Sequence, residues 1–232
     1  HPLRTRPAPA AVAPAAPPAT PSRTRRHTSD PLAAWAPDAA AIVAQLDDLQ
    51  RRKKNGKVAL PDGDTLDVTN LDKVFWPRGR RTKGDLLRYY AQIAPLLLPV
   101  IADRPLVMKR LPNGVDGPAF YQHRAPEPVP AGALTTLLYM AQLASISMDP
   151  FFSTVDALHT PDQVAIDLDP QPGATFADIL AVARWVHEIL ERVGVEAFPK
   201  TSGSEGLHIF IPLRAGTPYQ AGMLFCQIVA TM

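Results

Sequence analysis

The sequence predicts an α+β protein in which helices flank a mixed central sheet. Apolar residues recur at helical spacing in segments 86–100 and 176–193. Apolar and polar residues alternate in segment 163–169, a pattern that is typical of strands, and we also expect a strand over residues 207–213. From the first of these strands onward the predicted order is strand, helix, strand, strand, helix. The last helix is still running at Met232, so we expect a fold that is incomplete at its C-terminal end.

Composition divides the chain into three parts. Residues 1–38 are rich in proline and alanine, and such a segment buries too little apolar surface to offset its ordering entropy. We therefore expect a disordered linker there. Residues 39–63 form a helical and basic lead-in, with apolar residues at helical spacing in 39–50. Residues 64–232 carry the patterns of a folded domain.

Charge and cysteine content narrow the classes of protein. The formal net charge of +2 arises in the first part of the chain, so a nucleic-acid surface has to be argued from local patches. Cys226 is the only cysteine, which excludes an internal disulfide framework and a cysteine-rich zinc site. The longest apolar run, 96–102, is too short to span a bilayer. We expect a soluble cytoplasmic protein that does not enter membranes.

Two short motifs precede the first predicted helix of the folded domain. Pro61-Asp62-Gly63 is a turn signature between short strands. Thr82-x-x-Asp85 is a capping box, which predicts that a helix opens there. Lys83 would then lie in the first helical turn beside exposed backbone N–H groups, a place that suits a phosphate better than a lone cation.

Basic and aromatic residues are interleaved in the region between residues 73 and 121. Such a mixture fits a nucleic-acid surface, on which cations hold phosphates and rings stack on bases. An ordinary basic face with core aromatics explains it equally well. Phe120 and Tyr121 are adjacent in a predicted strand, so at most one of them is expected to be in the core. The earlier basic run 51–57 is more typical of a solvated helix end.

An acidic pair lies in the predicted strand that begins near residue 163. Because side chains alternate along a strand, Asp167 and Asp169 share one face and the apolar residues share the other. Two neighbouring carboxylates repel each other, and a divalent cation relieves that repulsion. Two solvated acids on a half-exposed strand are the simpler reading of this motif alone.

A small, hydroxyl-rich loop and a histidine follow about thirty residues later. Thr175-x-x-Asp178 caps the intervening helix, and Gly194 ends it. Ser202-Gly203-Ser204-Glu205-Gly206 is able to present backbone N–H groups to a phosphate, although it equally fits a plain turn. His208 lies on the next strand. An acid pair, a phosphate-type loop and a histidine together form a set that nucleotidyl transfer uses.

Four ordered motifs of this sequence resemble the polymerase domain of bacterial ATP-dependent DNA ligase D, of the archaeo-eukaryotic primase superfamily. The resemblance covers about residues 64–232. Its motifs are Leu71-Asp72-Lys73-Val74-Phe75-Trp76-Pro77, Lys109-Arg110-x-Pro112-Asn113-Gly114, Asp167-Leu168-Asp169-Pro170 and Thr201-Ser202-Gly203-Ser204-x-Gly206-Leu207-His208. The resemblance implies template-dependent nucleotidyl transfer, with a preference for ribonucleotides, at double-strand breaks during non-homologous end joining.

The resemblance also implies a role for each matching residue. Asp167 and Asp169 match carboxylates that bind Mn²⁺ or Mg²⁺ and carry the catalysis. The nucleoside triphosphate would be contacted by Ser202, Ser204, Gly206 and His208, and Lys109 and Asn113 would line the nucleotide and template region. DNA would be bound by Lys73 and Lys83, which match lysines that grip a 5′-phosphate across a gap, and by the template-stacking pair Phe120 and Tyr121. The implied partners are DNA with 5′-phosphorylated gaps or ends, a linked ligase module and a Ku-type end-binding protein.

The sequence departs from the family pattern at several places. Glu205 stands where many members carry lysine, Asp149 stands where relatives often carry histidine, and the region around residues 130–133 is short. The third metal carboxylate of the family would lie beyond Met232. We therefore expect this chain alone to be weakly active or inactive as an enzyme. Two other classes stay open, a non-catalytic module that binds 5′-phosphorylated DNA ends and a two-metal phosphohydrolase.

Overall fold

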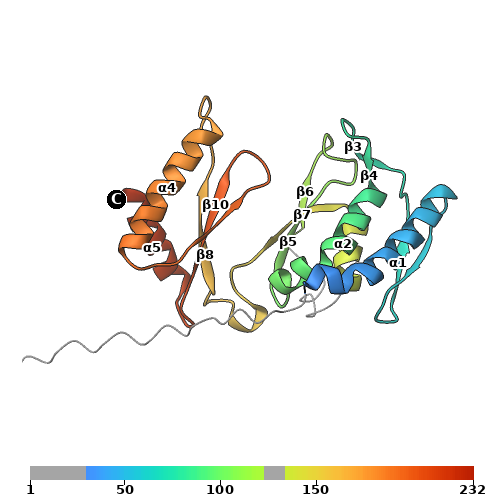
Figure 1. The fold of residues 1–232 in the computed structure, drawn as a ribbon, viewed down its shortest axis with the longest axis horizontal. Coiled ribbons are helices and arrows are strands. Elements are labelled where there is room, and N and C mark those ends of the chain that lie inside the picture. Colours follow the sequence, from blue (N-terminus) through green and yellow to red (C-terminus); the bar gives the residue numbers. More distant parts are fainter. Residues whose placement is uncertain (1–29, 123–133) are drawn as a thin grey trace, which may run out of the picture.

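The computed structural model describes residues 30–122 and 134–232, and it shows two lobes with separate cores (Figure 1). The first lobe contains three helices, α1 (Pro31–Arg51), α2 (Lys83–Ile101) and α3 (Leu134–Gln142). Its strands are β1 (Gly56–Ala59), β2 (Thr65–Val68), β3 (Val74–Trp76), β4 (Arg81–Thr82), β5 (Leu106–Arg110), β6 (Phe120–Gln122) and β7 (Ser145–Pro150). The α+β class is confirmed.

The second lobe has the predicted order of elements. It consists of β8 (Gln163–Leu168), α4 (Phe176–Arg192), β9 (Phe198–Thr201), β10 (Leu207–Pro212) and α5 (Tyr219–Thr231). The two helices pack on one face of the sheet, where Val164, Ile209 and Ile211 are buried with Leu190 and Val229. In Figure 1 the helices α4 and α5 lie on the outer flank of the second lobe, and in the first lobe β5, β6 and β7 lie toward the middle of the molecule while α1 lies on the outer side.

The sheets differ from the single mixed sheet that we expected. The described strands form four small sheets, with the orders β1-β2, β3-β4, β6-β5-β7 and β8-β10-β9. Every described pair is antiparallel. Hairpin loops join several of these neighbours, and a tight turn permits only antiparallel pairing. Strand β7 was not predicted, although its residues Ser145 to Asp149 alternate between polar and apolar.

The two capping boxes position α2 and α4 as predicted. The Thr82 hydroxyl accepts a hydrogen bond from the Asp85 N–H, and the Asp85 carboxylate accepts one from the Thr82 N–H. Thr175 and Asp178 repeat this arrangement at α4. Those hydrogen bonds hold the pKa of Asp178 below its usual value. Each box satisfies N–H groups that the first turn of a helix leaves without helical partners.

Helix α1 is longer than its sequence pattern indicated. It begins at Pro31 rather than at residue 39, so residues 31–38 are helical instead of belonging to the expected linker. Asp30 caps this start by accepting from the Leu32 N–H, and Pro31 occupies the first position. The Trp35 indole donates to the Ala91 carbonyl of α2 at 2.6 Å. This tertiary contact holds the first turns in a helix despite the proline at position 37.

A short connection between β7 and β8 ties the lobes together. Arg104, at the end of the first lobe's helical layer, forms an ion pair with Asp162 and donates to the Phe151 carbonyl. Tyr219 of α5 donates to the Ser153 hydroxyl at 2.9 Å. The connection therefore has partners in both lobes, which fixes how their sheets are placed. No helix among the described residues is long and apolar enough to cross a membrane.

Candidate functional site

The open face of the β8-β10-β9 sheet carries a row of three charged or titratable side chains. Asp167 on β8 is paired in register with His208 on β10, and His208 is paired with Lys200 on β9. The Asp167 Oδ1 lies 3.3 Å from His208 Nε2. The Asp167 side chain is 59% exposed, whereas the apolar residues of β8 face the core. The alternation predicted for this strand is confirmed, and Asp167 points away from the helices.

The loop between β9 and β10 closes against the end of β8. The Ser202 hydroxyl accepts hydrogen bonds from the Ser204 N–H at 3.2 Å and the Gly206 N–H at 3.1 Å. A Cβ atom at Gly206 would lie 2.5 Å from the Leu168 carbonyl oxygen and 2.7 Å from Asp169 Oδ1. Glycine at 206 therefore allows the loop and the Asp169 carboxylate to lie side by side.

These contacts change one expectation about the loop. We expected it to present several free backbone N–H groups to a phosphate, but the Ser204 and Gly206 N–H groups already donate to Ser202. A phosphate at this loop would either replace that hydroxyl or use other donors. His208 and Lys200 are candidates for such donors, because both lie in the row with Asp167 on the neighbouring strands.

The acidic pair has the chemistry to hold a divalent cation. Asp167 and Asp169 are both exposed and supply carboxylate oxygens, the ligands that Mg²⁺ and Mn²⁺ prefer. Within the described ranges no group of three or more His, Cys, Asp or Glu side chains is close enough to hold a metal ion. The pair thus fits as two ligands of such an ion. Two other acids have structural partners, since Asp162 forms an ion pair with Arg104 and Asp178 caps α4.

The two predicted phosphate-binding lysines lie together in the first lobe. Lys73 is exposed and its Nζ donates to Asn113 Oδ1 at 3.3 Å. Lys83 is only 6% exposed. Burial and then the nearby Lys73 charge lower the pKa of Lys83 to about 8. Two close ammonium groups, one of them desolvated, form a site that an anion would stabilise.

The backbone around Lys83 departs from the prediction. We expected N–H groups of the first helical turn to be exposed beside it. Instead the Lys83 N–H donates to the Lys73 carbonyl at 2.8 Å and the Gly84 N–H donates to the Leu71 carbonyl at 2.9 Å. These carbonyls are brought to the helix start by the β3–β4 hairpin, which reverses the chain. Any anion at this place would be bound by lysine side chains rather than by the helix terminus.

The aromatic pair lies at the edge of the β6-β5-β7 sheet. Phe120 is 44% exposed and Tyr121 is 55% exposed, so neither is a core residue. Each ring has a cation from β5 over it, Arg110 4.8 Å from the Phe120 centroid and Lys109 5.9 Å from the Tyr121 centroid. Exposed rings with adjacent cations suit a base stacked beside a phosphate.

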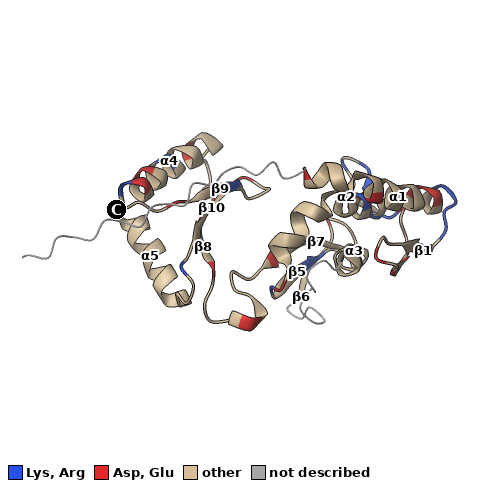
Figure 2. Cartoon of the chain, turned by 60° about the horizontal axis from the view of Figure 1, so that its bottom comes forward, with Lys and Arg blue, Asp and Glu red and all other residues tan. Residues whose placement is uncertain are grey.

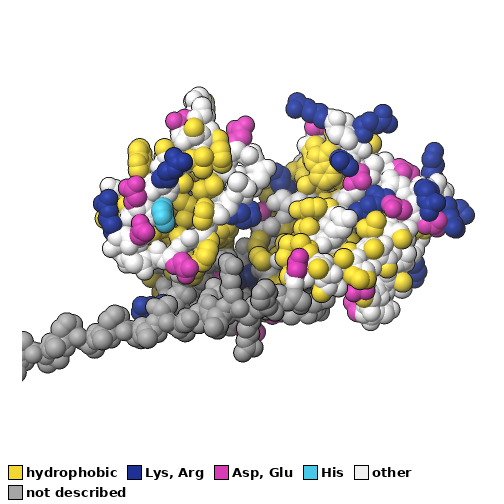
Figure 3. Space-filling view, in the orientation of Figure 1, with side chains coloured by type: hydrophobic (Ala, Val, Ile, Leu, Met, Phe, Trp, Pro, Cys, Tyr) yellow, Lys and Arg dark blue, Asp and Glu magenta, His cyan; other side chains and the backbone are white. Residues whose placement is uncertain are grey.

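The other basic and aromatic residues of this region divide into two groups. Arg88 and Arg104 form ion pairs within the protein, and Phe75 and Tyr90 belong to the core. Burial raises the pKa of Tyr90 to about 12. Side chains at the β3–β4 hairpin remain available and stand out from the surface (Figure 3). They line a hollow of about 720 Å³ together with α2, and its walls include Trp76, Arg78, Arg81 and Tyr89.

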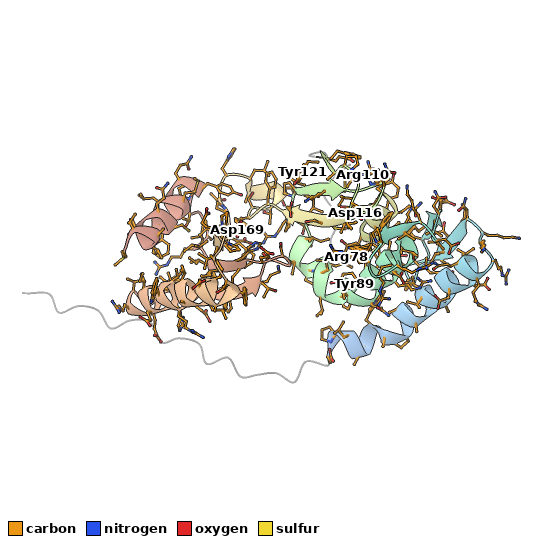
Figure 4. All side chains as sticks on the ribbon, turned by 90° about the horizontal axis from the view of Figure 1, so that it is seen from above. Arg78, Tyr89, Arg110, Asp116, Tyr121 and Asp169 are labelled. Carbon is orange, nitrogen blue, oxygen red and sulfur yellow. The ribbon has the colours of Figure 1, made fainter. Side chains whose placement is uncertain are left out.

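The predicted site residues thus form one group in each lobe. Asp167, Asp169, Ser202, Ser204, Gly206 and His208 gather at one end of the second lobe's sheet. Lys73, Lys83, Lys109, Asn113, Phe120 and Tyr121 lie in the first lobe. Figure 4 shows Asp169 on the side of the second lobe that is nearer to the first, with Arg110 and Tyr121 on the first.

Lys200 was missed as a site residue. Its place follows from the pairing of β9 with β10, because Thr201 opposes Leu207 and Lys200 therefore opposes His208. The strands and the short loop between them were predicted. Counting back from that loop would have placed a cation beside the histidine and the acid.

Comparison with known proteins shows the family to which the chain belongs. The family model described as "LigD, primase-polymerase domain" matches residues 82–136 and 129–232. This chain belongs to the LigD primase-polymerase domain family. A solved structure, "Polymerase Domain from Mycobacterium tuberculosis Ligase D in complex with DNA", matches with a TM-score of 0.62 and 31% identity, over 71% of this chain and 67% of that one.

Curated relatives are longer LigD proteins. The multifunctional non-homologous end joining DNA repair protein LigD of Mycobacterium tuberculosis is 34% identical over 173 residues, which cover 63% of this chain and 23% of the relative. The bifunctional non-homologous end joining protein LigD of Bacillus subtilis is 26% identical over 181 residues, which cover 71% of this chain and 30% of the relative. The chain therefore spans less than a third of the length of these relatives.

Proposed function

We propose that this LigD primase-polymerase domain is a DNA-directed nucleotidyltransferase. It adds nucleotides, preferentially ribonucleotides, to a primer end opposite a template at DNA double-strand breaks. The observation that carries the proposal is the register of β8 and β10, which places Asp167 beside His208 while Asp169 lies beside the Ser202–Gly206 loop. Acids for a metal and groups for a triphosphate are thus assembled at one end of one sheet.

The reaction forms one bond and breaks one. The primer 3′-oxygen bonds to the α-phosphorus, the bond from that phosphorus to the pyrophosphate oxygen breaks, and the proton of the 3′-hydroxyl passes to solvent. Asp167 and Asp169 would hold Mn²⁺ or Mg²⁺, which neutralises charge on the reacting phosphate when bound. His208 and the Ser202 hydroxyl would orient the triphosphate, and Lys200 would add a positive charge beside them. Catalysis of this kind depends on positioning and charge neutralisation.

The first lobe would hold the DNA. Lys73 and Lys83 would bind the 5′-phosphate at the far side of a gap. The negative charge of that phosphate would offset the cost of burying the Lys83 ammonium group. Phe120 and Tyr121 would stack on the template strand, with Lys109 and Asn113 lining the path toward the nucleotide. The M. tuberculosis domain, which was solved in complex with DNA, supports DNA as the ligand.

The wider role follows from the relatives. Their names describe non-homologous end joining, and we propose the same repair process for this chain. A ligase module and a Ku-type end-binding protein would be its partners there.

Replacing Asp167 by alanine tests the catalytic assignment. Asp167→Ala should abolish Mn²⁺-dependent addition of one nucleotide to a gapped duplex while binding of that duplex stays within about twofold, because the acid holds metal and not DNA. Glu188→Ala is the matched control, since Glu188 is an exposed acid on the outer helix α4. Equal activity of Asp167→Ala and wild type would contradict the assignment.

The same assay distinguishes the alternative of a non-catalytic module that binds 5′-phosphorylated ends. Two observations favour this alternative. Lys83 is a desolvated cation suited to an anion, and the Ser204 and Gly206 N–H groups already donate to Ser202 and are not free for a triphosphate. The alternative predicts tight binding of 5′-phosphorylated gaps without any nucleotide addition, both by this chain and by a version extended through the next strand. Release of nucleotides from the DNA, lost in Asp167→Ala, would instead indicate a phosphohydrolase.

A further inference from the structure

The end of helix α1 and the segment before β3 enclose a cavity of about 470 Å³. One wall is formed by the residues that follow the helix, and Figure 2 shows a basic cluster at this end of the first lobe. The side chains that matter are Lys53, Lys54 and Asn55 on that wall and Asn70, Asp72 and Lys73 on the other. Three lysines therefore share one hollow, and one of them is the proposed 5′-phosphate ligand Lys73.

Hydrogen bonds hold the two walls in this position. The Gln50 amide donates to Asp72 Oδ1 at 3.0 Å, and the Asn70 N–H donates to Asn55 Oδ1 at 3.0 Å. The Asp72 carboxylate, which would repel an anion in the cavity, is thereby engaged by an amide. The basic run after α1 is exposed, as its sequence suggested, and two of its residues, Lys53 and Lys54, also line one wall of this hollow.

Lys53 occupies a backbone conformation that lysine disfavours. Its φ is +51°, in the left-handed region. It is the first residue beyond the helix cap, where its N–H donates to the Gln50 carbonyl and the Lys54 N–H donates to the Leu49 carbonyl. This pattern of helix termination is usually made with glycine, because a side chain there is strained. A cationic side chain is thus kept at a place where the fold alone would favour glycine.

Lys73 connects this cavity to the site described above. Its Nζ donates to Asn113, and the same residue lines the cavity opposite Lys53 and Lys54. A strand whose terminal phosphate lies at Lys73 and Lys83 would place its following phosphodiesters near the cavity. Lysine ammonium groups attract such phosphates without regard to sequence.

We propose that Lys53 and Lys54 bind a backbone phosphate of the downstream DNA strand, beyond its 5′-terminal phosphate. This inference rests on the proposed function, because it assumes that Lys73 and Lys83 hold that terminal phosphate. It assigns the segment that follows helix α1 a role in substrate binding, as an added wall that lengthens the DNA contact.

Lys53→Gly gives a sharp test because it should separate binding from stability. Removing the cation should weaken binding of a gapped duplex about three- to tenfold near 0.1 M salt and reduce the salt slope by about one. The melting temperature should stay equal or rise, because glycine relieves the left-handed strain. Lys53→Asn, which also tolerates this conformation, should bind as weakly. Arg52→Ala is the matched control, because Arg52 belongs to the same run and pairs with Asp48 outside the cavity.

Neutral methylphosphonate linkages in the downstream strand locate the contact. One such linkage near the 5′ end should weaken binding by the wild type but leave Lys53→Gly unaffected. Lys53→Gly should also weaken binding of 5′-phosphorylated and 5′-hydroxyl duplexes by the same factor. If Lys53→Gly binds every duplex as wild type does, the inference is overturned while the proposed function stands. If the wild type itself binds no gapped duplex, the proposed function fails and the inference fails with it.

Discussion

At the scale of single residues, the desolvated Lys83 is the group with the clearest electrostatic consequence. Burial disfavours its charged form, and Lys73 adds to that effect. Its pKa of about 8 lies below the ordinary value of 10.5, so the folded protein carries an unfavourable charge at pH values below about 8. As the pH rises from there toward 10.5, the folded state loses this proton first and the penalty is relieved.

Lys83→Met should therefore separate stability from phosphate recognition. Without DNA, the variant should be at least as stable as wild type near pH 7, because a methionine side chain has no charge to desolvate. Its preference for 5′-phosphorylated over 5′-hydroxyl gaps should fall at least about tenfold, the usual effect of losing one charge-assisted hydrogen bond. The wild-type preference should decline as the pH rises above about 8, and that of the variant should be flat. Binding titrations at several pH values measure both.

Lys57→Met is the control for a change of charge, because Lys57 is exposed on β1. It should alter neither the pH profile nor the phosphate preference. A Lys83→Met protein that keeps the full 5′-phosphate preference would show that Lys83 does not bind the phosphate.

The residues of the site were predicted unevenly. The exposure of Asp167 followed from local alternation, since a strand has a period of two whatever it packs against. The partners of the Lys83 and Gly84 N–H groups did not follow, because the Leu71 and Lys73 carbonyls reach them only after the β3–β4 hairpin has formed. Lys200 was missed for a related reason, as its role depends on cross-strand register.

At the scale of elements, the sequence predicted those whose signals are local. The capping boxes at Thr82 and Thr175 mark helix starts, because the hydrogen bonds involved span only three residues. The first turns of α1 were missed although Asp30 and Pro31 form a local start signal, and the Trp35 contact with Ala91, far along the chain, supports these turns in the structure. Strand β7 was missed although its residues alternate between polar and apolar, and in the structure it pairs with β5.

The close approach of the 202–206 loop to the end of β8 predicts the effect of adding one methyl group. Gly206→Ala should push the loop from the Leu168 carbonyl and move the Asp169 carboxylate, since the added Cβ has no room. We expect a loss of about 1–3 kcal/mol in the free energy of unfolding, typical of overpacking. Nucleotide addition should fall more than tenfold.

Gly203→Ala is the companion variant in the same loop. Gly203 has a φ of +89° with open space around it, so alanine there strains the backbone without displacing Asp169. Denaturant unfolding and single-nucleotide addition are measured for both variants. A Gly206→Ala protein with the activity of Gly203→Ala would contradict the geometry assigned to this loop.

At the scale of the whole molecule, the proposed site depends on two lobes with separate cores. The metal and triphosphate groups belong to β8 and β10, and the phosphate and template groups belong to the first lobe. Arg104, bound to Asp162, and Tyr219, bound to Ser153, fix the connection between them. Local sequence patterns predict each half but not this placement, which follows from contacts between residues more than fifty positions apart.

The most direct test of a site that spans both lobes is to compare two gapped duplexes that differ only in the downstream 5′ end. The chain, extended through the strand expected after Met232, would be given Mn²⁺, one complementary ribonucleotide and DNA below saturation. Addition should be at least about tenfold faster with a 5′-phosphate than with a 5′-hydroxyl, because the phosphate gains charge-assisted contacts with Lys73 and Lys83. Equal rates on the two duplexes would contradict the account, because Lys73 and Lys83 would then contribute nothing to a reaction at Asp167 and Asp169.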